Sequence, residues 1–338
     1  MLTDKEFLVD AVITWVDGSD QMHKQKMAGY IKNKSLLNSK AIGMRYDQVN
    51  EIEFSVKSIL KYAKFVRNIY IVTDNQIPEF LKDLEKAKKE YPTVFIVDHK
   101  TIFEGYQQHL PTFNSLSIES LLFKIPNLSE HFIYFNDDFF LLKNTVVTDF
   151  FVKGSPVIRG KWKLFHEDIW HKNIKYLFQK LLQYKNVRYS HSKGIQRAAK
   201  LLSFTKYIFP EHTPSSMRKG VLSKYFEENS TVLLENTKHR FRSPKQFVCH
   251  SLSNHLEIKQ ETFNLKKDNQ LIYFQNYKKP FFWIKFKLEQ MTKDENKLFL
   301  CMQSLNQCPE EKLRFIKSWL HKKYNSCLLY TSPSPRDS

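Results

Sequence analysis

An amide and two adjacent carboxylates, Asn136, Asp137 and Asp138, directly follow an apolar, β-prone run that ends at Phe135. Neighbouring carboxylates raise each other's pKa unless a counter-charge offsets their repulsion. At the end of a buried strand, a hard divalent cation is a counter-charge that suits two aspartates. The pair therefore predicts a Mg2+ (or Mn2+) site in which Asp137 and Asp138 are the ligands. A turn after an edge strand, where Asn and Asp are favoured anyway, is the alternative.

Three further runs of β-branched or aromatic residues are each followed by an acid. The expected strands cover residues 11–16, 66–73, 94–97 and 132–135, and the acids after the first three are Asp17, Asp74 and Asp98. Because ligands of open α/β sheets bind at the carboxyl ends of the strands, carboxylates from separate strands can converge there on one crevice. Capping of the next helix or turn is the alternative, which we favour for Asp98.

Apolar residues at helical spacing between these strands predict βα units around a mostly parallel sheet. Helices are expected over residues 49–60, after Pro78, and over residues 115–124. The predicted fold class is therefore α/β, with a Rossmann-like, mostly parallel sheet flanked by helices and a helical basic insert. Residues 1–150 are expected to form the α/β core that carries the strand-end acids.

The rest of the chain is expected to divide into three parts. Residues 151–248 mix aromatic side chains with Lys, His and Arg, which predicts amphipathic helices forming a substrate-binding or phosphate-binding insert. Residues 249–327 are expected to complete the core and to close with a helix over 309–323. Residues 328–338 resemble translated sequencing-adapter sequence, so we expect them to be non-native and exclude them from the fold prediction.

The chain is strongly basic: its 338 residues include 53 Lys and Arg against 35 Asp and Glu, for a net charge of +18. Such a charge attracts polyanions, namely nucleic acid, anionic lipid head groups or phosphorylated substrates. The sequence carries no zinc-finger spacing, RRM-type aromatic signature or basic heptad array, so specific nucleic-acid binding is not expected. A non-catalytic polyanion-binding protein remains an alternative. Basic helices over residues 172–206 could also contact an anionic membrane surface.

Cysteine usage and hydropathy bear on the compartment. The four cysteines lack CxxC spacing and are too few to staple a chain of this length, which favours a reducing compartment. The sequence begins without a basic region followed by an apolar segment, and no apolar run reaches about 18 residues. We therefore expect a cytoplasmic protein, soluble or held peripherally on the inner face of the cell membrane.

Several blocks of sequence together carry a resemblance to a known family. They cover residues 10–20, 45–51 with 71–78, 110–119, 132–142, 210–219 and 239–244. The chain closely resembles the Stealth family of capsular polysaccharide phosphotransferases, which also includes the catalytic core of the animal enzyme that tags lysosomal glycoproteins with N-acetylglucosamine 1-phosphate. The resemblance covers about residues 9–322. Residues 299–304 depart from it, because relatives usually carry an Asn-Asp pair there.

The resemblance implies transfer of a sugar 1-phosphate from a nucleotide sugar, UDP-linked in our expectation, to a hydroxyl of a glycan acceptor in capsule or cell-surface polysaccharide. A nucleoside monophosphate would leave and a phosphodiester would form. Attack on phosphorus accumulates negative charge on phosphoryl oxygens, so catalysis depends mainly on positioning and electrostatic stabilisation. Mg2+ held by Asp137 and Asp138 would supply part of that stabilisation.

Five side chains are candidates for catalytic roles. Arg197 matches a family arginine and could clamp phosphates in a bidentate fork, with Arg242 as a second clamp. His212, between two prolines, could be the general base toward the acceptor hydroxyl or a phosphate ligand. Asp17 at the end of the first strand is the alternative base, and Asp138 is expected to act in catalysis as well as in metal binding.

Further residues are expected to contact the two substrates. The donor or its phosphates are expected to contact Gly18, Ser19, Asp74, Asn75 and Arg242. Gly18 permits a close approach of the backbone. Asn114 and Ser115 are the expected acceptor contacts, although a helix N-cap would explain Ser115 equally well. The nearest rival function is a metal-dependent glycosyltransferase, in which the acceptor attacks the anomeric carbon and a glycosidic link forms.

Overall fold

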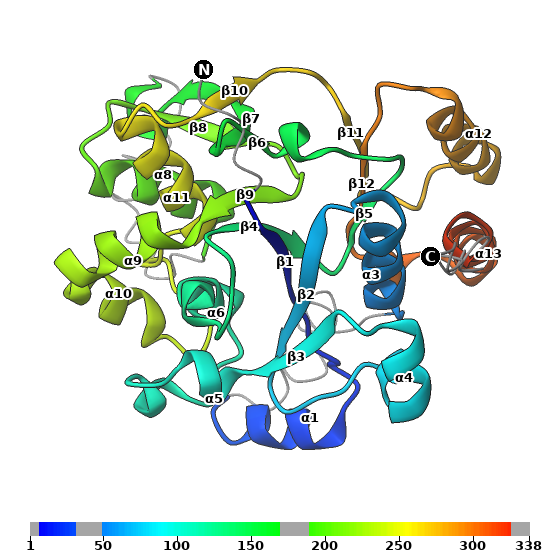
Figure 1. Cartoon of the computed structure of the whole chain (residues 1–338), viewed down its shortest axis with the longest axis horizontal. Coiled ribbons are helices and arrows are strands. Elements are labelled where there is room, and N and C mark those ends of the chain that lie inside the picture. Colours follow the sequence, from blue (N-terminus) through cyan, green and yellow to red (C-terminus); the bar gives the residue numbers. More distant parts are fainter. Residues whose placement is uncertain (1–6, 32–48, 170–188, 326–338) are drawn as a thin grey trace, which may run out of the picture.

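The computed structural model describes residues 7–31, 49–169 and 189–325 (Figure 1). A five-stranded sheet in the order β3-β2-β1-β4-β9 lies at its centre. The strands are β1 (Val9–Thr14), β2 (Val66–Thr73), β3 (Val94–Asp98), β4 (His131–Asn136) and β9 (Ser215–Arg218). The first four pair in parallel, and β9 pairs antiparallel with β4. The expected strands and the mostly parallel sheet are thus confirmed.

The strand order creates a switch point between β1 and β4. From β1 the chain continues to β2 and then β3 on one side, before it crosses to β4 on the other side. Thr14 pairs with Val72 of β2 and with Asn136 of β4, so the three strands end at the same level. In open α/β sheets, the crevice outside the strand ends at such a switch point is the usual place for a ligand.

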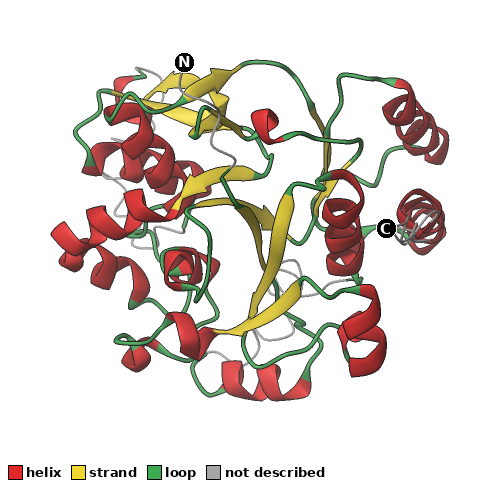
Figure 2. Ribbon diagram, viewed as in Figure 1, coloured by secondary structure: helices red, strands yellow, loops and turns green. Residues whose placement is uncertain are grey.

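Both faces of the central sheet are covered by helices (Figure 2). Side chains alternate along a strand: Ala11 and Ile13 pack in the hydrophobic cluster that includes α3, whereas Val12 packs in the cluster of the opposite face. That opposite face is covered by α6, α9, α10 and α11. The helices of these layers are α1 (Gln21–Ala28), α3 (Glu51–Tyr62), α4 (Leu84–Glu90), α5 (His99–Ile102), α6 (Ser115–Glu119), α8 (His191–Leu201), α9 (Lys219–Glu228), α10 (Ser230–Thr237) and α11 (Cys249–Lys259).

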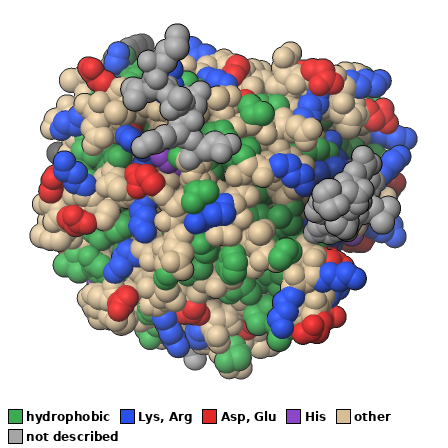
Figure 3. All heavy atoms as spheres, in the orientation of Figure 1, with side chains coloured by type: hydrophobic (Ala, Val, Ile, Leu, Met, Phe, Trp, Pro, Cys, Tyr) green, Lys and Arg blue, Asp and Glu red, His purple; other side chains and the backbone are tan. Residues whose placement is uncertain are grey.

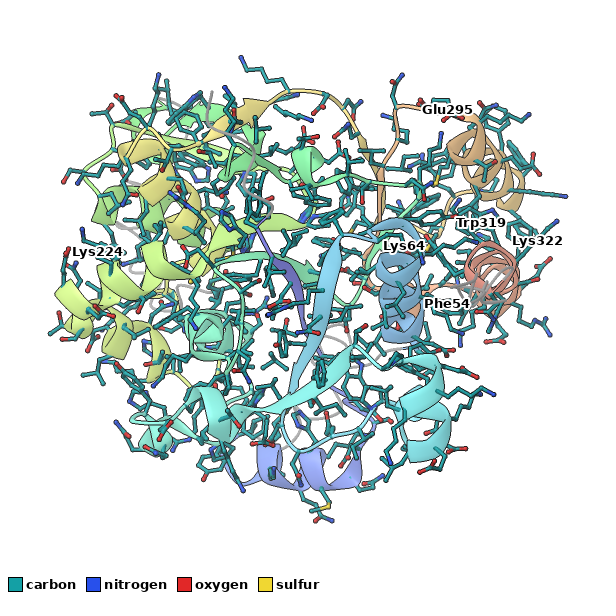
Figure 4. All side chains as sticks on the ribbon, viewed as in Figure 1. Phe54, Lys64, Lys224, Glu295, Trp319 and Lys322 are labelled. Atoms are coloured by element: carbon teal, nitrogen blue, oxygen red, sulfur yellow. The ribbon has the colours of Figure 1, made fainter. Side chains whose placement is uncertain are left out.

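A smaller sheet extends the core on the α3 side. It contains β5 (Phe139–Leu141), β12 (Phe299–Met302) and β11 (Leu271–Phe274), with β12 between the other two. The helices α12 (Phe281–Lys293) and α13 (Glu310–Asn325) cover it. Phe54 of α3 and Trp319 of α13, both labelled in Figure 4, pack in the hydrophobic cluster that joins these parts. Because β5 begins directly after Asp138, its pairing in this sheet holds the backbone at Asp138 in place.

The segment 151–248 is not purely helical, which corrects the expectation of a helical insert. It contains β6 (Phe151–Val152), β7 (Ser155–Leu164), β8 (Lys206–Pro210) and β9, and β10 (Asn264–Lys266) joins β7 from outside it. Basic and aromatic side chains stack across the β7–β8 pair, with Lys163 Nζ 3.8 Å from the centre of the Phe209 ring. The side chains of this pair therefore alternate with the period of two of a strand, where the sequence analysis expects the period of an amphipathic helix. Residues 170–188 of the basic run lie outside the described residues.

The helices expected from the sequence are present, but they begin and end at other residues than predicted. The stripe over residues 49–60 forms α3, and the one over 309–323 forms α13. After Pro78 the chain makes a short 3-10 helix before α4, and the helix expected over 115–124 is split into α6 and a 3-10 turn. The 3-10 helices are Glu79–Leu81, Gln107–His109, Leu122–Lys124, Val147–Asp149, His166–Asp168 and Leu305–Gln307. Within the described ranges, no helix has the length and apolarity needed to cross a membrane.

Candidate active site

A cavity of about 510 Å³ lies at the switch point between β1 and β4. Its size is within the range of small-molecule sites. Its walls are formed by residues 14–16, His23, Glu51, Val72, His99, residues 112–115, Ile118, residues 136–138, Arg242, Gln303, Ser304 and Asn306. The strand-end position of the aspartate pair therefore coincides with a cavity.

Asp137 and Asp138 form an acidic centre in this cavity. Burial raises the pKa of both carboxyls, and Asp138 raises the pKa of Asp137 further. Burial and the nearby Glu51 raise the pKa of Asp138 to about 7. Oδ2 of Asp138 accepts a hydrogen bond from the Cys301 thiol at 3.8 Å, while Oδ1 is buried and has no hydrogen-bond partner among the described residues. The pair thus carries repulsion that a cation would relieve.

Glu51 is a third carboxyl of the cavity that the sequence interpretation did not assign. It begins α3, and its Oε2 accepts a hydrogen bond from the Val49 amide at 2.5 Å. Burial raises its pKa. The sequence does indicate this residue, because Glu51 directly precedes the apolar positions Ile52, Val56 and Ile59 of the helix.

The donor set of this acidic centre suits a hard divalent cation. Carboxylate oxygens are the ligands that Mg2+ prefers, and Asp138 Oδ1 has no competing hydrogen bond in the described structure. Among the described residues, however, no three His, Cys, Asp or Glu side chains are grouped to bind a metal ion. Asp137 and Asp138 would therefore bind the ion together with ligands that the protein does not supply, as Mg2+ in phosphate-transfer sites does with water and substrate phosphates.

Asp17 lies one residue beyond Val16, which lines the cavity. Its Oδ1 accepts hydrogen bonds from the Ser19 amide at 2.8 Å and the Ser19 hydroxyl at 2.6 Å. Its backbone amide and carbonyl both bond to the side chain of Gln76. Asp17, Gly18 and Ser19 therefore form a fixed turn at the edge of the cavity, outside its immediate wall.

The acids after β2 and β3 have partners of their own. Asp74 forms an ion pair with Lys26 of α1 at 2.9 Å, and Asn75 has a left-handed backbone with φ of 54°. Neither residue is part of the cavity wall. Asp98 caps α5, because its Oδ1 accepts a hydrogen bond from the Lys100 amide at 2.7 Å. The capping role expected for Asp98 is confirmed.

Arg242, Asn114 and Ser115 all line the cavity. The exposed Arg242 donates from Nη2 to the Ser115 hydroxyl at 2.9 Å. Asn114, not Ser115, caps α6: its Oδ1 accepts from the Leu116 amide, and its Nδ2 donates to His239 and Gln246. The Asn114 amide is thus engaged in holding α6, which leaves Ser115 and Arg242 as the more available pair.

Arg197 lies away from this cavity, contrary to its expected place beside the phosphates. It is on the exposed face of α8 and donates from Nη2 to the Pro244 carbonyl at 2.9 Å. The opposite face of α8 is buried through Ile195, Ala198 and Ala199. Helical spacing therefore turns Arg197 outward, a consequence that the motif alone did not reveal.

His212 lies behind the wall of the cavity. Its ring stacks on Tyr273 at 5.0 Å between centroids, and the Tyr273 hydroxyl donates a hydrogen bond to Gln303, which lines the cavity. Burial and the nearby His250 lower the pKa of His212 below its usual 6.5, so its imidazole is neutral at pH 7. His250 in turn lies 3.4 Å from Glu119. The sequence interpretation missed this link through Tyr273 because the two histidines and the tyrosine are far apart in the chain.

This fold and site define a Rossmann-like α/β protein with an acidic crevice at its switch point. Two family models match the chain: Stealth protein conserved region 1 over residues 7–35 and conserved region 2 over residues 45–157. The exopolysaccharide phosphotransferase cps2G of Lactiplantibacillus plantarum is 33% identical over 262 residues, which cover 72% of this chain and 73% of that protein. The chain belongs to the Stealth family.

Other relatives match over the first part of the chain. The capsular polysaccharide phosphotransferase cps1A of Actinobacillus pleuropneumoniae is 44% identical over 146 residues, or 42% of this chain. The match spans only 38% of that relative's length. Among solved structures, mouse xyloside xylosyltransferase 1 in its apo form covers 89% of this chain and 99% of its own, with 9% identity and a TM-score of 0.39.

Proposed function

We propose that this protein transfers a sugar 1-phosphate, of a hexose or N-acetylhexosamine, from a nucleotide sugar to a hydroxyl of a glycan acceptor, forming a phosphodiester in capsule or other cell-surface polysaccharide. The carrying observation is the pair Asp137 and Asp138 in the switch-point cavity, with one carboxylate oxygen unpartnered among the described residues. Membership of the Stealth family and the printed names of its relatives support the same reaction type.

The proposed reaction breaks and forms bonds at the phosphorus that carries the sugar. The acceptor oxygen forms a new P–O bond, and the P–O bond to the nucleoside monophosphate breaks. Bound Mg2+ (or Mn2+) would neutralise charge on the diphosphate. Asp137 and Asp138 would hold that ion, and Arg242 at the cavity wall would orient phosphate oxygens through its guanidinium.

The hydroxyl of the glycan must lose a proton during the reaction. His212 and Asp17 are the two proposed general bases that would take this proton. The neutral imidazole of His212 can accept a proton at pH 7, and it connects to the cavity through Tyr273 and Gln303. Asp17 directly follows Val16, which lines the cavity. Two hydrogen bonds from Ser19 already occupy the Oδ1 of Asp17. Separate His212→Ala and Asp17→Asn variants would distinguish these roles by which one removes the pH dependence of kcat.

The deciding experiment is product analysis. Purified protein, Mg2+, a UDP-sugar and a glycan acceptor are incubated, and the products are followed by phosphorus NMR. Release of UMP together with a phosphodiester resonance supports the proposal. Release of UDP with a glycosidic link would establish the rival metal-dependent glycosyltransferase, for which the same carboxylates are equally suitable.

A non-catalytic polyanion-binding protein is the alternative from another class. Lys and Arg side chains occur over the whole face seen in Figure 3, with Asp and Glu among them. That distribution accounts for general attraction to polyanions but gives the aspartate pair no role. Asp138→Asn would abolish turnover on the enzyme proposal, whereas a binding protein would keep its affinity for an anionic polysaccharide.

We also propose that the protein works on the cytoplasmic side of the cell membrane, held there peripherally through its basic surface. Nucleotide sugars are made in the bacterial cytosol, and the net charge of +18 favours contact with anionic lipids. Sedimentation of the full chain with anionic but not neutral vesicles, reversed by salt, tests this contact. Equal sedimentation with both vesicle types would overturn it.

A further inference from the structure

Two phenylalanine side chains project from α12 into solvent. Phe282 is 74% exposed and Phe286 is 59% exposed, more than any other phenylalanine of the described ranges. Because the two residues are four apart in a helix, their rings lie next to each other on one face. A single exposed apolar residue is normal on a protein surface, whereas two large rings side by side indicate a surface that contacts something apolar.

The opposite face of α12 already anchors the helix to the protein. It is buried in the hydrophobic cluster beneath the helix through Ile284, Leu288 and Met291. Phe281 adds an edge-on ring contact with Phe315 of α13, at 5.2 Å between centroids. Phe282 and Phe286 belong to none of the hydrophobic clusters that the described residues form. The packing of the fold therefore gives no reason for their apolar character.

Lysines accompany the two rings along α12. Residues 278–293 include five lysines and a single acid, Glu289. Lys287 is half-buried and donates a hydrogen bond to the Tyr273 carbonyl at 2.9 Å. The other four lysines are exposed, namely Lys278, Lys279, Lys285 and Lys293. The exposed side of α12 thus combines a pair of aromatic rings with an excess of positive charge.

The exposed helix α4 has a different composition. Its Leu84 is 66% exposed, and three lysines follow within the helix. Two acids lie among these lysines, and one of them, Glu85, forms an ion pair with Lys88 at 3.3 Å. One aliphatic side chain among charges of both signs is typical of a solvated helix face. α12 differs from α4 both in its paired rings and in its charge.

The composition of the exposed side of α12 fits a lipid surface that carries negative charge. A helix of this kind binds there by inserting apolar rings at the boundary of head groups and acyl chains, while its lysines meet the lipid phosphates. An anionic polysaccharide would satisfy the lysines and leave both rings in water. A stable protein partner requires roughly 800 Å² of matching surface on each side, of which two rings supply only a part.

We propose that α12 is the surface through which the protein contacts the membrane. Phe282 and Phe286 insert into the boundary between head groups and acyl chains of an anionic bilayer, and the four exposed lysines contact the lipid phosphates. This assignment deepens the peripheral membrane contact proposed above and rests on it. α12 lies at the edge of the molecule (Figure 1), and none of its residues lines the cavity, so docking and transfer use separate surfaces.

Sedimentation with vesicles tests the assignment on the full chain. The vesicles contain phosphatidylglycerol and phosphatidylcholine, or phosphatidylcholine alone. Phe282→Ser with Phe286→Ser should lower the partition coefficient onto the anionic vesicles by at least about tenfold, because even half of the free energy of burying each ring amounts to that for the pair. Lys279→Glu with Lys285→Glu should lower it by about tenfold or more at low salt, and by less as salt is added.

Matched control variants come from α4. Leu84→Ser removes an exposed apolar side chain, and Lys86→Glu with Lys89→Glu reverses two helix lysines. Each control should stay within about threefold of the parent on anionic vesicles, because a small change in a large net charge alters only the general attraction. Tm should be the same in all variants within a few degrees, since the substituted side chains are exposed. Equal losses in the α4 and α12 variants would overturn the assignment.

A depth measurement distinguishes insertion from contact by charge alone. A fluorescent label is attached at Phe286→Cys or at Leu84→Cys, in both cases with Cys327→Ser so that the remaining cysteines are buried. Lipids brominated in their acyl chains should quench the label at position 286 and leave the label at position 84 unquenched. Equal quenching at the two positions, or none at 286, would overturn insertion of the α12 rings.

The outcomes separate this inference from the reaction proposal. Release of UMP with a soluble acceptor should be the same in the parent and in the double phenylalanine variant, because α12 is outside the cavity wall. Vesicle binding through α12 without UMP release would overturn only the proposed transfer. UMP release together with undiminished vesicle binding of the double phenylalanine variant would overturn only the role of α12. A dimer that this variant abolishes, without vesicle binding by the parent, would assign the surface to a second copy of the chain.

Discussion

The thiol of Cys301 donates a hydrogen bond to Oδ2 of Asp138 across 3.8 Å, joining β12 to the end of β4. Burial raises the pKa of the Cys301 thiol, which keeps it protonated and able to donate. The backbone adds a second link, because the Met302 amide donates to the Asp138 carbonyl at 3.0 Å. One oxygen of the Asp138 carboxylate is thereby held by the protein, and the other remains for a ligand.

This contact predicts opposite effects for two substitutions of Cys301. A hydrogen bond to the ionised carboxylate lowers its pKa, so Cys301→Ala should raise the pKa of Asp138 and Cys301→Ser, a stronger donor, should lower it. The acid limb of the pH profile of kcat/KM should move in the same directions, by roughly half a pH unit or less. Cys308→Ser, at a buried cysteine of the α12–α13 cluster, is the control and should not move the limb. Shifts of equal sign in both Cys301 variants would contradict this account.

Asp138→Asn should separate catalysis from stability. We expect the rate of transfer to fall by at least about a hundredfold, because the neutral amide binds the cation weakly and does not balance its positive charge. In metal-free buffer the same variant should be more stable than the parent above pH 7. The folded protein keeps a proton on Asp138 up to about pH 7, whereas an unfolded aspartate releases it near its ordinary 3.8. Stability should therefore decline between these pH values in the parent and decline less in the variant, as Tm against pH would reveal.

Mg2+ should stabilise the parent protein by binding to the folded state. The stabilisation grows with the logarithm of ligand concentration above the Kd, so millimolar Mg2+ should raise Tm progressively at a pH above 7. The rise should disappear in Asp137→Asn and Asp138→Asn and persist in Asp74→Asn, whose carboxylate is already paired with Lys26. An undiminished rise in the two cavity variants would place the cation elsewhere.

The strands of the α/β half were predictable because their signals are local. Apolar runs bounded by an acid mark β1 to β4, and the stripe of Ile52, Val56 and Ile59 marks α3. The parallel order then implied that acids after different strands would meet at one edge. The cavity does lie at the strand ends beside Asp137 and Asp138, but Asp17, Asp74 and Asp98 are outside its wall, so the acids of the other strands do not converge there.

Contacts between distant segments could not be predicted in the same way. Gln303 and Ser304 reach the cavity only because β12 pairs with β5. The place of Arg197 depends on which face of α8 is buried, and a motif does not contain that information. On β7 the exposed Lys161 and Lys163 flank the half-buried Trp162 and are followed by the exposed Leu164, so the contrast between buried and exposed positions that marks a strand is weak there.

Arg242 and Arg197 offer a matched pair that tests the site against the motif. Both are exposed, and each donates a side-chain hydrogen bond within the protein, Arg242 to Ser115 and Arg197 to Pro244, but of the two only Arg242 lines the cavity. Arg242→Gln should lower kcat/KM by about a hundredfold through loss of charge stabilisation on the phosphates, and Arg242→Lys should restore only part of it. Arg197→Gln should stay within about threefold of the parent, since an exposed substitution away from the site changes stability by no more than about 0.5 kcal/mol. Steady-state kinetics of the three variants, with Tm measured alongside, decide the question. A large loss in Arg197→Gln at unchanged Tm would mean that α8 moves to the cavity during turnover, and would return Arg197 to the phosphates.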